Sequence, residues 1–124
     1  MPLKVSGPFH TKFMQPAGEA LLHKFAEISF GEMQVPVIFN TIAEELTADK
    51  SVAELLVQQV QSSIYMEDTI KLLEAKGVDT IVEIGPGKVL SGFIKRTASG
   101  MTSYTIEDME SLKTTLTALK TEQN

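Results

Sequence analysis

Residues 80–90 have the sequence TIVEIGPGKVL, and this stretch indicates the fold most directly. Thr80–Ile84 has the length and apolar character of a buried strand, which the glycine-rich turn 85–87 ends. A strand, a glycine turn and a helix start are also the parts of an anion-binding site, because the first N–H groups of a helix are free. The stretch matches neither the GxxxxGK(S/T) loop nor GxGxxG, which favours a tight turn over a phosphate site. The residues predicted to face inward on the following helix are Val89, Leu90, Phe93 and Ile94.

On either side of this stretch, strands and helices alternate. Val35–Phe39 and Thr102–Ile106 are predicted to be strands. Apolar spacing and capping residues predict four helices: Gln15–Ile28, one after the capping box of Ser51 and Glu54, one from about Met66 to Gly77, and one after Asp108. On the last of these helices, the residues that share one face are Met109, Leu112, Leu116 and Leu119. The predicted fold class is α/β, with a small parallel sheet of about three strands and flanking helices. Parallel strands need cover on both faces, so a sheet this thin indicates that part of a larger domain is missing.

The composition is that of an ordinary globular domain. The chain has 124 residues, of which 43% are hydrophobic and 22% charged, and its formal net charge is −5. This charge disfavours nucleic-acid binding, which needs a basic face. No apolar run has the length of a membrane span, so no membrane association is predicted. The absence of cysteine excludes disulfides and a cysteine nucleophile, and it fits a cytoplasmic location.

His10 is the first candidate for chemistry, because it follows a short apolar segment, Leu3–Val5, on a loop that contains Gly7 and Pro8. Histidine titrates near neutrality and can accept and return a proton. A loop histidine without such a role is the alternative. His23 lies within a predicted helix, where a pair with Glu19 or Glu27 explains it without a site. Two distant histidines predict no metal site.

Two further observations limit the function. The chain contains no GxSxG nucleophile elbow, and Ser91, which precedes Gly92, lies inside a helical pattern. No complete serine–histidine arrangement is therefore present. Lys88, Lys95 and Arg96 lie near one side of a predicted helix, where they form either a small basic patch or a solvated face.

Four motifs in order resemble those of the bacterial malonyl-CoA:acyl-carrier-protein transacylases. The motifs are VSGPFH at 5–10, MxPA at 14–17, PVxxN at 36–40 and EIGPGKVLSGxxKR at 83–96. The likeness extends from Leu3 to about Leu119 and concerns the C-terminal portion of that family. It implies an α/β-hydrolase-like acyltransferase subdomain, with residues 1–10 as the end of a ferredoxin-like subdomain strand and the catalytic histidine loop, 11–120 as the C-terminal part of the larger subdomain, and 121–124 as a polar tail.

The resemblance also implies a mechanism and its residues. In that family a serine attacks the malonyl thioester and a histidine, here His10, is its base. The backbone carbonyl of Gln59 would orient His10. Phe9 would line the acyl pocket and favour malonyl over methylmalonyl groups, although a packing role is the alternative. The nucleophilic serine and the arginine that pairs with the malonyl carboxylate are expected upstream of this chain.

The partners implied are malonyl-CoA, acyl carrier protein and the missing N-terminal part of the same enzyme, with no cofactor and no metal. The isolated chain is expected to be inactive in malonyl transfer and to self-associate. Two alternatives stay open, an acyltransferase domain of a polyketide synthase and a non-enzymatic module that binds a partner through a sheet edge and the helix carrying Lys88 to Arg96.

Overall fold

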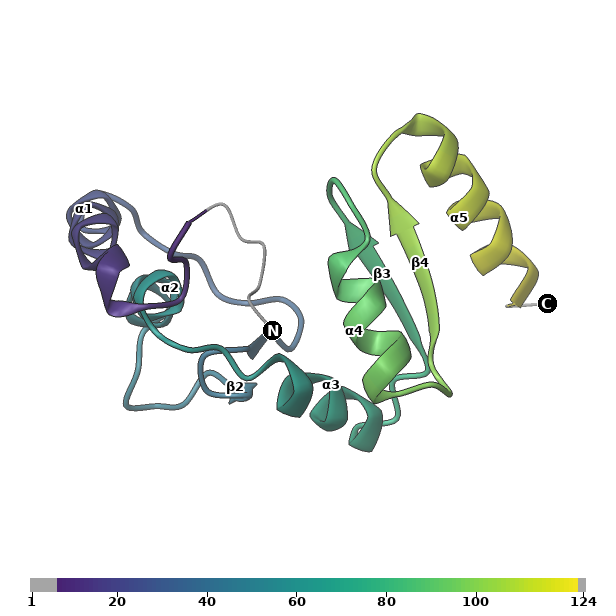
Figure 1. Cartoon of the computed structure of the whole chain (residues 1–124), viewed down its shortest axis with the longest axis horizontal. Coiled ribbons are helices and arrows are strands. Elements are labelled where there is room, and N and C mark those ends of the chain that lie inside the picture. The colour runs from purple at the N-terminus through teal and green to yellow at the C-terminus, as the bar shows by residue number, and fades with distance from the viewer. Residues whose placement is uncertain (1–6, 123–124) are drawn as a thin grey trace. The chain divides into compact units, whose positions relative to one another are not determined.

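The computed structural model describes residues 7–122, so the predicted segment Leu3–Val5 lies outside the described residues. The chain divides into two compact units, Met1–Thr69 and Ile70–Asn124. In chain order, the elements are η1 (Lys12–Met14), α1 (Gln15–Phe25), β1 (Ile38–Phe39), β2 (Glu44–Glu45), α2 (Val52–Gln61), α3 (Met66–Ala75), β3 (Thr80–Ile84), α4 (Val89–Thr97), β4 (Thr102–Ile106) and α5 (Met109–Glu122) (Figure 1). The α/β class and the small parallel sheet with flanking helices are confirmed.

In the first unit, α1 and α2 pack against each other. Pro16 lies in the first turn of α1, where its missing N–H costs no helical hydrogen bond. Gly18 is buried at the contact, and a Cβ atom there would lie 2.5 Å from Oε1 of Gln61. The helix ends at Phe25 rather than at the predicted Ile28, because residues 26 and 27 form a turn.

The predicted strand Val35–Phe39 is wrong in extent and in pairing. Only Ile38–Phe39 is extended in a ladder, and it pairs antiparallel with Glu44–Glu45. Val35 is 68% exposed, so the apolar run is not a buried strand. Pro36 contributes to this outcome, because a residue without an N–H cannot donate to a ladder.

The helix signals at α2 and α3 are confirmed. The Ser51 hydroxyl accepts from the backbone N–H of Glu54 at 3.2 Å, and the Glu54 carboxylate accepts from the backbone N–H of Ser51 at 2.7 Å. This is the reciprocal capping box that the sequence predicts. Gly77 follows the end of α3 with a φ of 83°, a conformation that glycine adopts without steric cost.

The second unit is built on two parallel strands. β3 and β4 pair in parallel from Thr80 opposite Thr102 to Ile84 opposite Ile106. The helix α4 connects them, and both α4 and α5 pack on β4 (Figure 1). The prediction of three parallel strands is therefore wrong for the described residues, in which the parallel sheet has two.

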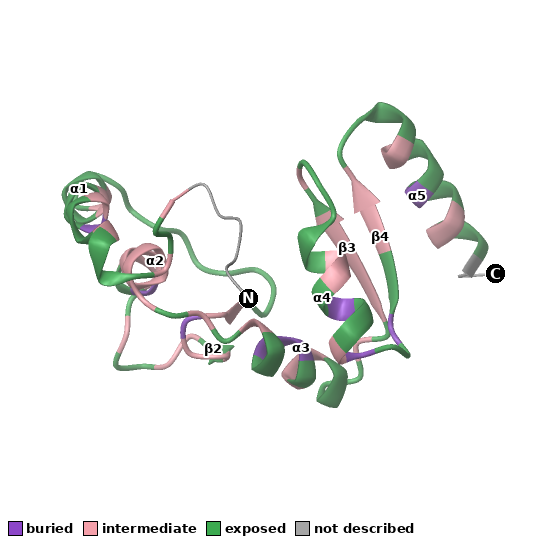
Figure 2. Ribbon diagram, viewed as in Figure 1, coloured by how far each residue is buried: buried purple, intermediate pink, exposed green. Residues whose placement is uncertain are grey.

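The buried apolar residues are few in the part of the chain that the structure describes. They are Leu55, Ile70, Ile94, Ala98 and Met101, and Figure 2 shows how little of the ribbon is buried. Of the four residues predicted to face inward on α4, only Ile94 is buried, because the described chain supplies nothing to cover the remainder of the helix face. On α5, Met109 and Leu116 are likewise exposed. None of the described helices is long and apolar enough to cross a membrane.

Candidate functional site: a histidine held by the end of a helix

His10 is fixed by two consecutive backbone carbonyl groups of α2. Its backbone N–H donates to the carbonyl oxygen of Val60 at 3.1 Å. Its ring nitrogen Nδ1 lies 2.6 Å from the carbonyl oxygen of Gln59. Its φ is 60°, a left-handed conformation that is uncommon for a residue with a side chain. The ring and the backbone of His10 are therefore held by the same helix end.

The hydrogen bond to Gln59 determines which ring nitrogen carries the proton. A carbonyl oxygen only accepts, so Nδ1–H of the neutral ring donates to it. The other nitrogen, Nε2, then carries a lone pair. The side chain is half-buried and lines an open hollow of about 300 Å³, together with Thr11, Lys12, Gln61, Ser62 and Ser63. In the neutral ring, Nε2 is therefore the nitrogen that can accept a proton, and the side chain borders the hollow.

The carbonyl groups that hold His10 are available because α2 ends there. The last carbonyls of a helix have no partner within the helix. The helix ends at Gln61, and Ser62 is extended, with φ −130° and ψ 162°. Gln59 and Val60 therefore lie in the last turn. The family resemblance implies the contact with Gln59, whereas nothing in the sequence indicates the second contact, with Val60.

The other predicted residues of this region are exposed. The side chain of Phe9 is 56% exposed, and its ring lies beside Gly7, where a Cβ atom would come within 3.2 Å of Cε2. His23 is exposed on α1. Among the described residues, the expected pair of His23 with Glu19 or Glu27 does not form; Glu19 accepts from Gln15 at 2.9 Å, and Glu27 pairs with Lys24 at 2.7 Å.

The turn 85–87 is not an open anion site, because a carboxylate of the chain occupies the start of α4. Oε1 of Glu83 accepts from the N–H of Leu90 at 3.0 Å, and Oε2 accepts from the N–H and the hydroxyl of Ser91 at 2.9 and 2.6 Å. The hydrogen bonds from Ser91, the hydroxyl above all, hold the pKa of the Glu83 carboxyl below its ordinary value. Gly85 and Gly87 have φ values of 142° and 92°. The stretch is therefore a tight turn with an internal cap.

We expect Glu83→Gln to lower the melting temperature of the chain by roughly 2–4 °C at pH 7, because the amide cannot provide two charged acceptors to the start of α4. The folded pKa of Glu83 is depressed, so its contribution is present above the unfolded pKa and is lost as the pH falls through the folded pKa. The difference in melting temperature between the chain and the variant should narrow below about pH 4. Circular dichroism melts at several pH values measure it, and a difference that widens on acidification would contradict the cap.

The basic residues on the same helix do not form a patch of free charges. The guanidinium carbon of Arg96 lies 5.0 Å from the centre of the Phe93 ring. Lys88 precedes the first turn of α4, whereas Lys95 lies in its last turn. Arg96 therefore covers an aromatic ring of its own helix, and the arrangement agrees better with a solvated face than with a docking patch.

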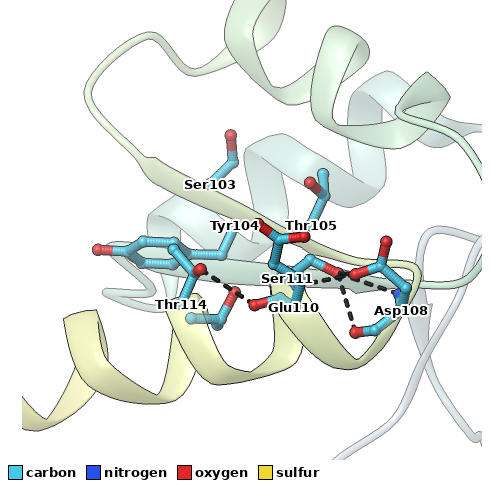
Figure 3. Close-up of a pocket in the computed structure, with 8 residues that line it drawn as sticks. Ser103, Tyr104, Thr105, Asp108, Glu110, Ser111 and Thr114 are labelled. Atoms are coloured by element: carbon cyan, nitrogen blue, oxygen red, sulfur yellow. Dashed lines mark hydrogen bonds between the residues drawn. The ribbon is translucent and has the colours of Figure 1, made fainter.

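A larger hollow, of about 410 Å³, lies between β4 and α5 in the second unit (Figure 3). Its polar groups mainly form hydrogen bonds with each other at the start of α5. Oδ1 of Asp108 accepts from the N–H of Ser111 at 2.8 Å, and the Ser111 hydroxyl accepts from the N–H of Asp108 at 3.0 Å. The Ser111 hydroxyl also donates to Oδ1 at 2.7 Å, and the hydrogen bonds from the N–H and the hydroxyl of Ser111 to this oxygen hold the pKa of the Asp108 carboxyl below its ordinary value. None of the predicted site residues lines this hollow, so His10 remains the candidate site. Residues 7–122 contain no group of three or more side chains suited to hold a metal ion.

Comparisons with known proteins agree on one class. No protein-family model matches the chain. The chain is 38% identical, over all of its length, to the malonyl CoA-acyl carrier protein transacylase of Bacillus subtilis (strain 168) and covers 39% of it. A crystal structure of the malonyl CoA-acyl carrier protein transacylase from Clostridium perfringens matches 99% of the chain, with a TM-score of 0.87 and 37% identity, over 39% of its own length. A third match, with a TM-score of 0.78 and 32% identity, is a malonyl-transacylase in complex with a type II PKS acyl-carrier protein; 92% of this chain and 37% of that one are covered.

These matches place the fold of the chain among the transacylases. In sequence as well, the chain corresponds to the C-terminal portion of the malonyl CoA-acyl carrier protein transacylases, as the motifs predict. It spans 37–39% of the length of these relatives. The share that it does not span is large enough to hold the nucleophile elbow that the sequence lacks.

Proposed function

We propose that the chain supplies the general base of a malonyl transfer from coenzyme A to the phosphopantetheine thiol of an acyl carrier protein, in fatty-acid synthesis in the cytoplasm. The observation that carries the proposal is the hydrogen bond from Nδ1–H of His10 to the carbonyl of Gln59, which leaves Nε2 of the ring as the proton acceptor. The names of the relatives support the choice of reaction. The nucleophilic serine comes from the portion of the relatives that this chain does not span.

In the proposed mechanism, Nε2 of His10 takes the proton of the serine hydroxyl as the serine oxygen attacks the malonyl thioester carbonyl. The tetrahedral intermediate collapses, the carbon–sulfur bond breaks, and the imidazolium returns the proton to the departing coenzyme A thiolate. The carrier-protein thiol then gives its proton to Nε2 and attacks the serine ester. The malonyl group leaves on the carrier sulfur, and the proton returns to the serine oxygen.

The Gln59 carbonyl has two tasks in this cycle. It keeps the ring in the tautomer with Nε2 unprotonated, and its negative dipole end stabilises the imidazolium that forms in each half-reaction. Because the acceptor is a backbone carbonyl, which does not gain or lose a proton, Nδ1–H has the same hydrogen-bond acceptor at every pH at which the chain is folded. We also propose that Phe9 borders the acyl group, because it precedes His10 directly and its exposed ring is available to a substrate.

The domain assignment is part of the same proposal. We assign residues 1–10 to the end of a ferredoxin-like subdomain and the histidine loop, and 11–120 to the α/β-hydrolase-like subdomain. Of the expected tail 121–124, residues 121 and 122 belong to α5, and the other two lie outside the described residues. A second acceptor, a polyketide carrier protein, is favoured by the match to the malonyl-transacylase in complex with a type II PKS acyl-carrier protein. Transfer assays with carrier proteins of both kinds distinguish the two.

We expect that the chain alone acquires no malonyl group from malonyl-CoA, because it contains no GxSxG serine for His10 to activate. Intact-protein mass spectrometry after incubation with malonyl-CoA measures this. The test of the proposal is a chimera in which this chain replaces the matched portion of the Bacillus subtilis relative. The chimera should form a serine-bound malonyl adduct and transfer it to acyl carrier protein. A chimera that folds but transfers nothing would favour the non-enzymatic binding module, and an adduct on the chain alone would contradict the missing serine.

A further inference from the structure

The conformation of His10 depends on the chain on both sides of it. Its φ of 60° lies in the left-handed region, where a residue with a side chain persists only if its surroundings hold it there. The carbonyl groups of Gln59 and Val60 hold the ring and the N–H of His10, and both belong to α2. These two contacts fix His10 itself, whereas the path of the chain before and after it needs a restraint of its own.

That restraint is a hydrogen bond across the turn that contains His10. The hydroxyl of Thr11 donates to the carbonyl oxygen of Pro8 at 2.6 Å. Residues 9 and 10 lie between these two groups and form a turn, of which His10 is the second residue. A turn with a positive φ at this place ordinarily has glycine or asparagine there. The bond from Thr11 therefore closes a turn that the histidine side chain by itself disfavours.

Thr11 does not use its hydroxyl in the way that its position favours. It is the N-cap residue of η1, with an extended backbone of φ −136° and ψ 165°. A threonine at an N-cap ordinarily accepts a hydrogen bond from an N–H group of the helix that follows. Within the described part of the chain, the Thr11 side chain forms no such cap, and its hydroxyl bonds back to Pro8 instead. The hydroxyl thus stabilises the turn that contains His10 rather than the helix after it.

We propose that Thr11 is a positioning residue, whose hydroxyl holds the imidazole of His10 in place through the turn 8–11. The proposal rests on the proposed function, in which Nε2 of His10 takes the serine proton. Without this hydroxyl the turn opens for part of the time, and the ring then moves away from the Gln59 carbonyl. The proton of the neutral ring is no longer fixed on Nδ1, and Nε2 is displaced from the serine. A displacement of about 1 Å can cost a catalysed reaction about 100-fold in rate, so even partial opening slows the transfer.

The direct test reads the tautomer of His10 in the chain itself. With isotopically labelled histidine rings, long-range proton–nitrogen spectra at about pH 8, where a free imidazole is neutral, show which ring nitrogen carries the proton. His10 should carry it mainly on Nδ1. Thr11→Val keeps the shape of the side chain without the hydroxyl, and it should raise the share of the Nε2–H form about threefold, as the loss of one hydrogen bond implies. Thr11→Ser should retain the tautomer of the parent chain, and His23, exposed on α1, is the internal reference that should not change.

The kinetic test uses the chimera with the Bacillus subtilis relative. Thr11→Val should lower kcat for malonyl transfer by about tenfold and change KM by less than about threefold, because the base acts in the transition state. Thr11→Ser should keep kcat within about twofold of the parent chimera, because serine supplies the same hydroxyl. Thr117→Val is the matched control: it removes an exposed hydroxyl that donates to the carbonyl of Lys113 at 2.9 Å, and it should change neither constant. Circular dichroism verifies that each variant is folded.

Three results would overturn the role of Thr11. They are an unchanged kcat in a folded Thr11→Val chimera, a loss that Thr11→Ser shares, and a His10 tautomer that is the same with and without the hydroxyl. A chimera that transfers no malonyl group at all would overturn the proposed function instead, and the tautomer measurement would then decide by itself whether Thr11 positions His10.

Discussion

His10→Ala in the chimera should reduce malonyl transfer by about 10³- to 10⁴-fold, because it removes the group that takes the serine proton and returns it to the thiolate. The loss should fall on kcat, since His10 binds no part of the substrate that the ground state needs. Transfer of radiolabelled malonyl groups to acyl carrier protein measures it.

Two matched variants separate the base from its surroundings. His23→Ala removes the other histidine of the chain, which is exposed on α1, and should leave transfer within about twofold. Gln59→Ala retains the backbone carbonyl that Nδ1 contacts and should also retain most of the activity. Equal losses from His10→Ala and His23→Ala would refute the assignment of the base, and a large loss from Gln59→Ala in a folded protein would refute the role of the backbone group.

The isolated chain should self-associate. Large apolar side chains are exposed in both units, and the most exposed include Phe13 at 83%, Ile84 at 79% and Val35 at 68%. Within the described residues, β3 and β4 pair only with each other, so each strand has an unpaired edge. Apolar surface and open strand edges favour contact with a second copy. The mass from light scattering should rise with protein concentration between about 5 and 200 µM, and the melting temperature should rise with it.

One substitution tests where this association occurs. Ile84→Lys places a charge at the end of β3 and should raise the concentration at which the chain associates by about tenfold, whereas Ser29→Lys adds the same charge to an exposed loop residue and should not. A monodisperse monomer with a melting temperature independent of concentration would contradict the prediction. It would mean that the chain folds as a self-sufficient domain.

The sequence predicts local features of this fold better than its pairing. The capping box of Ser51 and Glu54, the helix stop at Gly77 and the strand before Gly85 depend on residues a few positions apart, and the structure contains each of them. Val35–Phe39 was misassigned because an apolar run does not reveal whether a partner strand exists. The inward face of α4 was misassigned for a related reason, since apolar spacing shows which residues share a face and not whether anything covers it.

The residues of the candidate site likewise differ in how well the sequence predicts them. His10 stands out by residue type and by its loop, but the sequence contains no signal that Val60 and Gln59 meet it, because the contacts join residues 49 and 50 positions apart. Only the resemblance to a known family pointed to Gln59. Gln61 had no signal at all, since its position depends on a glycine of another helix. Long-range contacts of this kind require the fold.

The left-handed backbone at His10 allows the stability of the fold and the proposed catalytic role to be compared as reasons for a histidine at this position. Glycine would adopt this conformation without the strain of about 1 kcal/mol that a side chain brings, and it would lose a ring hydrogen bond of similar value. The two effects nearly cancel, so the stability of the fold gives histidine little advantage at this position. On the proposed function, in which His10 is the base, a lineage released from the need for acyl transfer should therefore lose this histidine early by neutral drift while the surrounding fold persists.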